Sequence, residues 1–196
     1  MATVKKSRLP TRVYQLRIEL ANIEPCIWRT LLVPDTLKLS KLDRVIQEAF
    51  GWTNSHLHEF RMGTKRYGMV DVVEDLDWDE EDALLDERKF TIGSVLSDDL
   101  DYFEYEYDFG DGWDHTVKVE KILVPDQTND WPMCIAGENA CPPEDVGGSY
   151  GFKEFVEIMA NPKNEQYEET YRWFGGPFDR RGFDLNSANA RIRRLR

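Results

Sequence analysis

The octapeptide CPPEDVGG at 141–148 carries the sharpest chemical signal in this sequence. Its two prolines hold φ near about −65°, and its two glycines permit a bend that other residues resist. A stiff arm of this kind presents the thiol of Cys141 and the carboxylates of Glu144 and Asp145 in fixed directions, which suits a metal or catalytic site. The alternative, which we favour, is a structural clamp whose carboxylates cap the next helix or pair with arginines.

A metal site is the next hypothesis, because the histidines and cysteines are of the ligand types that zinc prefers. His56 and His58 are two residues apart and would share one face of a strand, whereas His115 is expected to point inward. The predicted ligand set for zinc or another divalent metal is His58, His115, Cys134 and Cys141. The six residues between the two cysteines do not match the tight C-x2-C spacing of structural zinc sites, so core histidines and buried thiols are the favoured alternative.

Nucleophilic catalysis is a third chemistry that these residue types allow. Cys141 or Cys134 would need a nearby base such as His115 to form a thiolate at neutral pH. The sequence does not show that proximity, so this hypothesis rests on residue types alone.

The segment DFGDGWD at 108–114 places an aspartate at every third position. Spaced acids in a turn can bind a hard cation. Asp-Gly is also a common dipeptide of tight β-hairpin turns, and this interpretation is favoured.

The hydrophobic patterns around these residues predict both strands and helices. Alternation at 13–20 and 102–109 indicates half-buried strands, and an apolar stripe at 39–50 indicates an amphipathic helix ended by Gly51. Further segments are expected to be strands at 27–33, 56–62 and 115–124, a helical turn at 90–96, and helices at 150–160, 165–174 and 187–196. Residues 125–149 are expected to form an irregular ordered loop.

This element order predicts an α+β fold with a β-grasp (ubiquitin-like) core of mixed sheet plus helix. We expect a flexible tail at 1–10, the core at 11–125, and a CPPED loop with C-terminal helices at 126–196, packed together as one structural domain. Residues 71–82 hold eight carboxylates in twelve positions, which predicts a solvated acidic insertion at 71–88.

Charge and composition restrict the functional classes. The chain has 25 basic and 37 acidic residues and a net charge of −12, which counts against binding of phosphate backbones over the whole surface. No apolar run approaches the roughly 20 residues that cross a bilayer, so no membrane association is expected. Three cysteines fit a reducing compartment better than a disulfide framework, and this favours a cytoplasmic location.

Several segments together resemble one family. They are PCIWRTLLVPD (25–35), GWTNSHLHEF (51–60), YEYDFGDGWDHTVKVEKI (105–122), GENACPPEDVGG (137–148) and FDLNSANARIRRL (183–195). The chain resembles the plasmid pRiA4b ORF-3-like family, and the resemblance covers about 14–195. It implies a protein of bacterial or archaeal genomes that is sometimes described as a passenger of mobile elements, and it leaves enzymatic activity uncertain.

The leading functional hypothesis is a non-enzymatic binding or adaptor module with a protein or a small ligand as partner. Its candidate surface consists of His56, His58, Asp111, Trp113, His115, Cys141, Glu144 and Asp145. One alternative is a metal-dependent hydrolase or nuclease that uses the same residues. Another is a DNA-binding accessory protein of a transposable element, which would use the C-terminal arginines although nucleic acid is not the expected partner.

Overall fold

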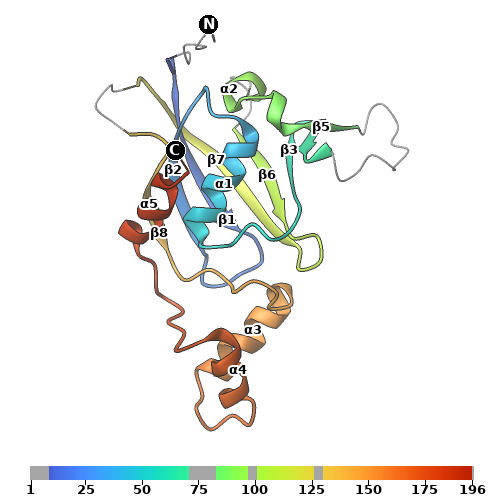
Figure 1. Ribbon diagram of the computed structural model, residues 1–196, viewed down its shortest axis with the longest axis vertical. Helices are drawn as coiled ribbons and strands as arrows, with labels where there is room; N and C mark the ends of the chain where they lie inside the picture. The colour runs from blue at the N-terminus through green and yellow to red at the C-terminus, as the bar shows by residue number, and fades with distance from the viewer. Residues whose placement is uncertain (1–8, 71–82, 97–100, 126–129, 196) are drawn as a thin grey trace, which may run out of the picture.

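The computed structural model describes residues 9–70, 83–96, 101–125 and 130–195, and these form one twisted sheet with helices (Figure 1). The strands are β1 (Val13–Leu20), β2 (Trp28–Pro34), β3 (His58–Met62), β4 (Lys65–Gly68), β5 (Leu84–Asp86), β6 (Tyr102–Tyr107), β7 (Trp113–Leu123) and β8 (Met133–Glu138). The helices are α1 (Leu39–Phe50), α2 (Ile92–Val95), α3 (Gly148–Met159), α4 (Tyr167–Phe174) and α5 (Leu185–Arg193), with a 3-10 turn η2 (Glu87–Lys89).

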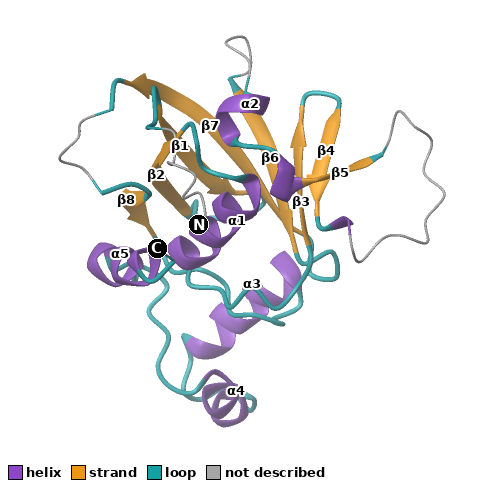
Figure 2. Ribbon diagram, turned by 45° about the horizontal axis from the view of Figure 1, so that its top comes forward, coloured by secondary structure: helices purple, strands orange, loops and turns teal. Residues whose placement is uncertain are grey.

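The strand order within the described residues is β5-β4-β3-β6-β7-β1-β2-β8. Every neighbouring pair is antiparallel except β4 and β5, which are parallel. The sheet is therefore mixed, with β6 and β7 at its middle and β1 between β7 and β2. The short β6–β7 connection and the α1–β3 connection both end at the same edge of the sheet as the loop before α3 (Figure 2).

Period-two alternation explains why the strands bury one face. In β6, Phe103, Tyr105 and Tyr107 are buried, whereas Tyr102 and Glu104 are exposed. Helix α1 lies on the buried face, and its apolar stripe contributes Leu39, Leu42, Val45, Ile46, Ala49 and Phe50 to the core. Gly51 ends α1 in a left-handed conformation with φ 100°, which a residue with a Cβ adopts only with strain.

The C-terminal helices form two separate groups around the sheet. Helix α5 packs beside α1 and β8, whereas α3 and α4 lie together at the far end of the molecule (Figure 1). Phe152 and Phe155 of α3 and Ile192 of α5 belong to the same buried cluster as the sheet residues. Helices α3 and α5 therefore share the core that α1 and the sheet build, whereas α4 contributes no buried residue to it.

The structure confirms the α+β class with a sheet, a central helix and a helical C-terminal extension, and it does not confirm the β-grasp assignment. That assignment came from element order, which does not determine strand pairing, and here β1 pairs antiparallel with both neighbours. The expectation of an irregular loop at 125–149 is wrong in part, since β8 forms within it and pairs with β2. The domain boundaries remain predictions.

The predicted acidic insertion at 71–88 falls only partly within the described residues, because residues 71–82 lie outside them. Its last part is not a solvated loop, since residues 84–89 form β5 and η2. Glu87 is only 3% exposed because its carboxylate meets a histidine in the interior. Among the helices that the structure describes, none has the length and apolar character to cross a membrane.

Candidate metal centre

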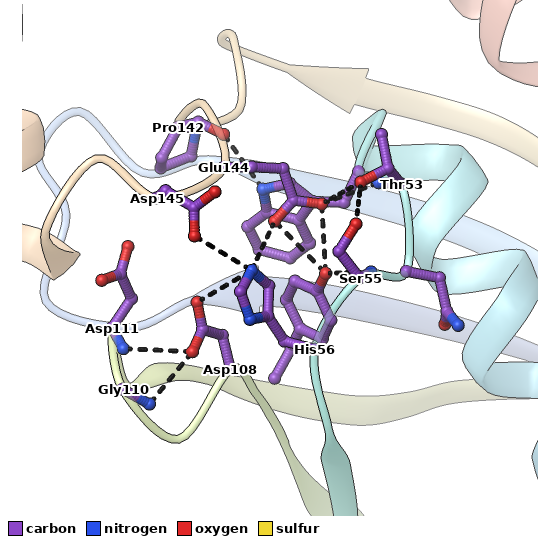
Figure 3. Close-up of polar contacts among 12 residues, drawn as sticks. Thr53, Ser55, His56, Asp108, Gly110, Asp111, Pro142, Glu144 and Asp145 are labelled. Atoms are coloured by element: carbon purple, nitrogen blue, oxygen red, sulfur yellow. Dashed lines mark hydrogen bonds and ion pairs between the residues drawn. The ribbon is translucent and has the colours of Figure 1, made fainter.

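Three loops converge at one edge of the sheet and bring their polar side chains together (Figure 3). One joins α1 to β3 at 51–57, one is the β6–β7 turn at 108–112, and one is the CPPED loop at 141–148. Figure 3 shows one nitrogen of the His56 ring facing the side chains of Asp108, Asp145 and Glu144. Residues distant in the sequence therefore form one polar cluster.

The Nε2 atom of His56 is the centre of this cluster. It lies 3.1 Å from Oδ1 of Asp145, 3.6 Å from Oδ2 of Asp108 and 3.9 Å from Oε2 of Glu144. His56, Asp108 and Asp145 place one ligand atom each within 4.8 Å of one another, and no other group of this kind occurs in the part of the chain that the structure describes. We call these three residues the His56 cluster.

The two aspartates of the cluster are held differently. Oδ1 of Asp108 accepts hydrogen bonds from the backbone N–H groups of Gly110 and Asp111, so Oδ2 is the oxygen directed at His56. The side chain of Asp145 is 74% exposed. Both aspartates have φ 56°, a left-handed conformation that aspartate tolerates better than most residues.

Glu144 acts as the clamp that the sequence suggested, although its partners are neither a helix end nor an arginine. Its Oε1 accepts from the backbone N–H of Thr53 at 2.7 Å, from the hydroxyl of Thr53 at 2.9 Å and from the hydroxyl of Tyr107 at 3.0 Å. Burial raises the pKa of the Tyr107 hydroxyl, and the nearby charge of Glu144 raises it further, so this hydroxyl remains a donor. Glu144 therefore fixes the CPPED loop to the α1–β3 loop.

A second attachment joins the CPPED loop to the β6–β7 turn. The Oδ2 atom of Asp111 accepts a hydrogen bond from the N–H of Gly147 at 3.1 Å. A Cβ on Gly148 would stand 2.5 Å from the carbonyl oxygen of Asp111, and Gly148 also has φ +67°. Only glycine permits this approach without displacement of the backbone, so the second glycine of CPPEDVGG positions Asp145 on the hairpin.

The geometry of the His56 cluster fits one divalent cation. Nε2 of His56 is buried and makes no hydrogen bond among the described residues, although three carboxylate oxygens lie within 3.9 Å. Two ligand atoms that each bond one ion at about 2.1 Å lie roughly 3.0–3.4 Å apart. The separations of 3.1 Å and 3.6 Å in the cluster are close to this range.

The predicted metal set of His58, His115, Cys134 and Cys141 is not brought together. His58 is 5% exposed, and its Nε2 lies 2.7 Å from Oε2 of Glu87 inside the protein. Cys134 is 1% exposed on β8, where its Sγ donates to the carbonyl oxygen of Ala136. These side chains are enclosed by different parts of the core, so they have no common space for an ion.

His115 is a core residue, as the favoured alternative predicted. Its ring is enclosed by the rings of Phe50, Trp52 and Tyr105 at centroid distances of 5.1, 5.4 and 5.3 Å. Burial lowers its pKa to about 4, so the imidazole is neutral at neutral pH. Trp113 is likewise buried, with 1% exposure, and belongs to the core and not to a surface.

Cys141 does not have the environment of a nucleophile. Burial raises the pKa of its thiol well above the ordinary value, despite the opposing charge of Arg29. The nearby charge of Glu144 also raises this pKa, and a neutral thiol is a weak nucleophile. The ring of His115, the base that the sequence suggested, is enclosed by Phe50, Trp52 and Tyr105. The pairing of Cys141 or Cys134 with His115 is therefore not supported by the geometry.

A second polar network, which the sequence did not predict, lies beneath α1. Asp43 is 2% exposed, accepts a hydrogen bond from the hydroxyl of Tyr105 at 2.8 Å and lies 3.3 Å from Nδ1 of His58. Burial raises the pKa of Asp43 to about 6, although His58 and Tyr105 oppose the shift. For His58, burial lowers the pKa, but the hydrogen bond to Glu87 and the charge of Asp43 outweigh it and raise the pKa overall.

Two signals in the sequence could have located these residues. Asp108 belonged to the series of aspartates at every third position, for which a hairpin turn was favoured over a cation site. Asp43 lies on the same helical face as Leu39, four residues earlier, where a lone carboxylate among apolar residues indicates a buried partner. Neither signal identifies the partner, which comes from another element.

Comparisons with known proteins agree with this fold. The family model of the plasmid pRiA4b ORF-3-like protein matches residues 12–187. The uncharacterized protein y4hQ of Sinorhizobium fredii is 40% identical over 184 residues, which cover 93% of this chain and 88% of that protein. The crystal structure of a protein of unknown function, MM3350 from Methanosarcina mazei Go1, has a TM-score of 0.80 at 32% identity and covers 91% of this chain and 97% of its own.

Proposed function

We propose that this chain, which belongs to the plasmid pRiA4b ORF-3-like family, is a binding module that holds one divalent metal ion at His56, Asp108 and Asp145. The observation that carries the proposal is the buried Nε2 of His56, which makes no hydrogen bond among the described residues and faces carboxylate oxygens at 3.1 and 3.6 Å. One imidazole nitrogen with two carboxylate oxygens is a donor set for manganese, iron or zinc.

The charge around the cluster supports a cation. Asp108, Glu144 and Asp145 all direct an oxygen toward His56, so an ion of charge +2 would reduce the repulsion among three carboxylates. Both aspartates also have a left-handed backbone at φ 56°. Residues in such sparsely populated backbone conformations are concentrated at functional sites, where the geometry that they give to a side chain is needed for binding or catalysis.

The exposed position of Asp145 supports a role in binding a partner. Three protein ligands leave coordination positions open, and the 74% exposure of the Asp145 side chain puts those positions at the surface. A carboxylate or other oxygen group of a protein or small-molecule partner would complete the coordination there. The ion would then join this chain to its partner.

The second candidate is a metal-dependent hydrolase, in which an ion held by His56, Asp108 and Asp145 would supply a water nucleophile at the same open position. Glu144 is the nearest further carboxylate, at 3.9 Å from Nε2 of His56. Its Oε1 accepts three hydrogen bonds, and its Oε2 accepts a further one from the hydroxyl of Tyr107 at 3.2 Å, so the carboxylate is committed to the clamp and is a poor general base. Because no free carboxylate of the cluster can act as the general base, the geometry supports a binding module better than a hydrolase.

The test is calorimetric titration of the metal-free chain with Mn²⁺ and with Zn²⁺. We expect one ion per chain, and at least about tenfold weaker binding for His56→Gln and for Asp145→Asn. Asp114→Asn is the matched control, because Asp114 is exposed on the same hairpin and lies outside the cluster. Equal affinity in all four proteins, or no saturable binding, would reject the site.

A second measurement separates the two candidate functions. The metal-loaded chain is incubated with a panel of activated phosphodiesters and carboxylic esters. Turnover that is lost in His56→Gln would favour the hydrolase over the binding module. Capture of a partner that needs the metal and His56, without turnover, would favour the binding module.

A further inference from the structure

A cavity of about 380 Å³ lies between the CPPED loop, the C-terminal end of α1 and the segment that connects α4 to α5. The side chains that matter for its chemistry are Arg29, Phe50, Trp52, Cys141, Phe183 and Arg191. None of the three ligands of the His56 cluster lines this cavity. It is therefore distinct from the metal centre, although Glu144 of the CPPED loop borders both.

Arg29 brings a buried positive charge to this cavity. The residue is 2% exposed, and its guanidinium donates to the carbonyl oxygens of Ala49, Trp28, Glu138 and Asn139. These bonds use four of its five N–H groups, and the remaining N–H on Nη2 has no acceptor in the described parts of the chain. All four acceptors are neutral, and no carboxylate forms an ion pair with Arg29 among these residues.

This arrangement is unusual for a buried arginine. Removing a guanidinium from water costs several kcal/mol, and buried arginines are normally paired with a carboxylate or another anion. The carbonyl of Ala49 lies at the C-terminal end of α1, where the helix dipole gives partial compensation. The charge remains without an anion, and it borders an open space.

The aromatic walls of the cavity fix the plane of the guanidinium. Its central carbon lies 4.0 Å from the ring centroid of Phe183 and 5.0 Å from that of Phe50. A Cβ on Gly137 would stand 2.7 Å from both Cδ of Arg29 and the ring of Phe183, so this stack depends on a glycine at 137. The packing holds Arg29 in one orientation, as a binding site requires.

The other charges around the cavity decide which anion fits. Arg191 adds a second positive charge, and its Nε donates to the carbonyl oxygen of Glu48 and lies 3.8 Å from the carboxylate of that residue. The acidic lining residues are Glu144, Asp179 and Asp184. Asp184 caps α5, Asp179 accepts from the N–H of Arg181, and Glu144 forms the clamp. Because three carboxylates and two arginines line the cavity, a ligand with two negative charges is disfavoured. The aromatic walls favour a ligand with an apolar body.

We propose that this cavity binds a small monocarboxylate with an aromatic or apolar body, whose carboxylate meets Arg29 and Arg191. The one N–H of Arg29 that is still free, on Nη2, would donate to one oxygen of the ligand's carboxylate, and Arg191 would donate to the other. The ligand's body would lie against Phe183, Phe50 and the indole of Trp52. Neutral Cys141 borders the site without a charge that would oppose the ligand.

The test is calorimetric titration of the full chain with phenylacetate, with phenylacetamide as the isosteric neutral compound and with inorganic phosphate. We expect saturable binding of phenylacetate, with phenylacetamide at least about tenfold weaker because it lacks the charge. Equal affinity for the two compounds, tighter binding of phosphate, or no saturable binding of phenylacetate would overturn the proposal.

Single substitutions test whether phenylacetate binds in this cavity. Arg191→Gln should weaken phenylacetate binding at least about tenfold, whereas Arg193→Gln, on the same helix but outside the cavity, should not change it. Arg29→Lys keeps the charge but loses the planar guanidinium that Phe183 and Phe50 hold in place, and it should also weaken binding. If this variant fails to fold, Arg191→Gln carries the test. His56→Gln should bind phenylacetate as the unmodified chain does, and a loss there would overturn the assignment to this cavity.

Discussion

The imidazole Nε2 of His56 lies 3.1 Å from Oδ1 of Asp145, although the two residues belong to different loops on opposite sides of the β6–β7 hairpin in the sequence. The contact exists because two hydrogen bonds hold the CPPED loop in place. Glu144 accepts from the N–H of Thr53, and the N–H of Gly147 donates to Asp111. A loop that sequence analysis treats as an isolated motif is therefore one wall of a site.

A divalent ion is expected to stabilise the folded chain. At an ion concentration of 100 times Kd, the gain is about 2.7 kcal/mol, or about 5–10 °C in Tm for a chain of this size. Differential scanning calorimetry with and without Mn²⁺ measures it. The shift should be small in His56→Gln and complete in Asp114→Asn, and an equal shift in both variants would contradict the proposed ligands.

Gly148→Ala should destabilise the chain by roughly 2–5 kcal/mol, because the new Cβ would stand 2.5 Å from the carbonyl oxygen of Asp111 and φ is +67°. Gly175→Ala is the matched control. Gly175 also has positive φ, at +89°, but nothing lies within 4 Å of its Cβ position, so only the backbone strain of about 1–2 kcal/mol remains. Urea unfolding of both variants provides the comparison, and equal losses would show that the close approach to Asp111 does not matter.

Glu144→Gln should loosen the CPPED loop at a cost of about 1–3 kcal/mol, because an uncharged amide oxygen accepts more weakly from Thr53 and Tyr107 than a carboxylate oxygen does. Hydrogen exchange should report faster exchange at the N–H of Thr53. Glu154→Gln, an exposed position in α3, is the control for loss of one negative charge. Unchanged exchange at Thr53 in Glu144→Gln would argue against the clamp.

The buried Asp43 should make the chain less stable as pH rises. Its pKa is raised from 3.8 to about 6 in the folded chain, so between these values the folded state holds a proton that the unfolded state has lost. Stability therefore falls between about pH 4 and pH 6, by an amount on the order of 3 kcal/mol. The raised pKa of His58 acts in the same direction, since its contribution is lost as pH rises through its folded value.

Urea unfolding at a series of pH values tests this dependence. Asp43→Asn cannot titrate at this position, so its stability should fall less between pH 4 and pH 6 than that of the unmodified chain. Asp114→Asn, at an exposed position, should retain the full dependence. Parallel curves for Asp43→Asn and the unmodified chain would exclude Asp43 as the titrating group.

The thiol of Cys141 should be unreactive in the folded chain. Burial raises its pKa, so little thiolate exists at neutral pH, and the thiolate is the reactive form. Mass spectrometry after brief iodoacetamide treatment should show Cys141 modified in urea but protected without it. Equal modification under the two conditions would reopen the hypothesis of a nucleophilic cysteine.

Patterns over short distances allowed much of the fold to be predicted. The alternation of β1 and β6 and the apolar stripe of α1 each report which face of one element is buried, because side-chain direction follows the local backbone. β8 was not predicted, because its Pro- and Gly-rich surroundings resemble a loop. The strand is stabilised by its pairing with β2, which its local sequence does not indicate.

The sequence by itself determined the α+β class, the family, and the stiffness of the CPPED loop, since these depend on composition, local period and the backbone limits of proline and glycine. Only the tertiary structure decided which imidazole meets which carboxylate. It put His56 with Asp108 and Asp145, and it enclosed His58 and His115 in the core. The physical reason is that a site requires side chains from different elements to lie within bonding distance of one another. Those distances come from strand pairing and loop docking, which no local pattern encodes.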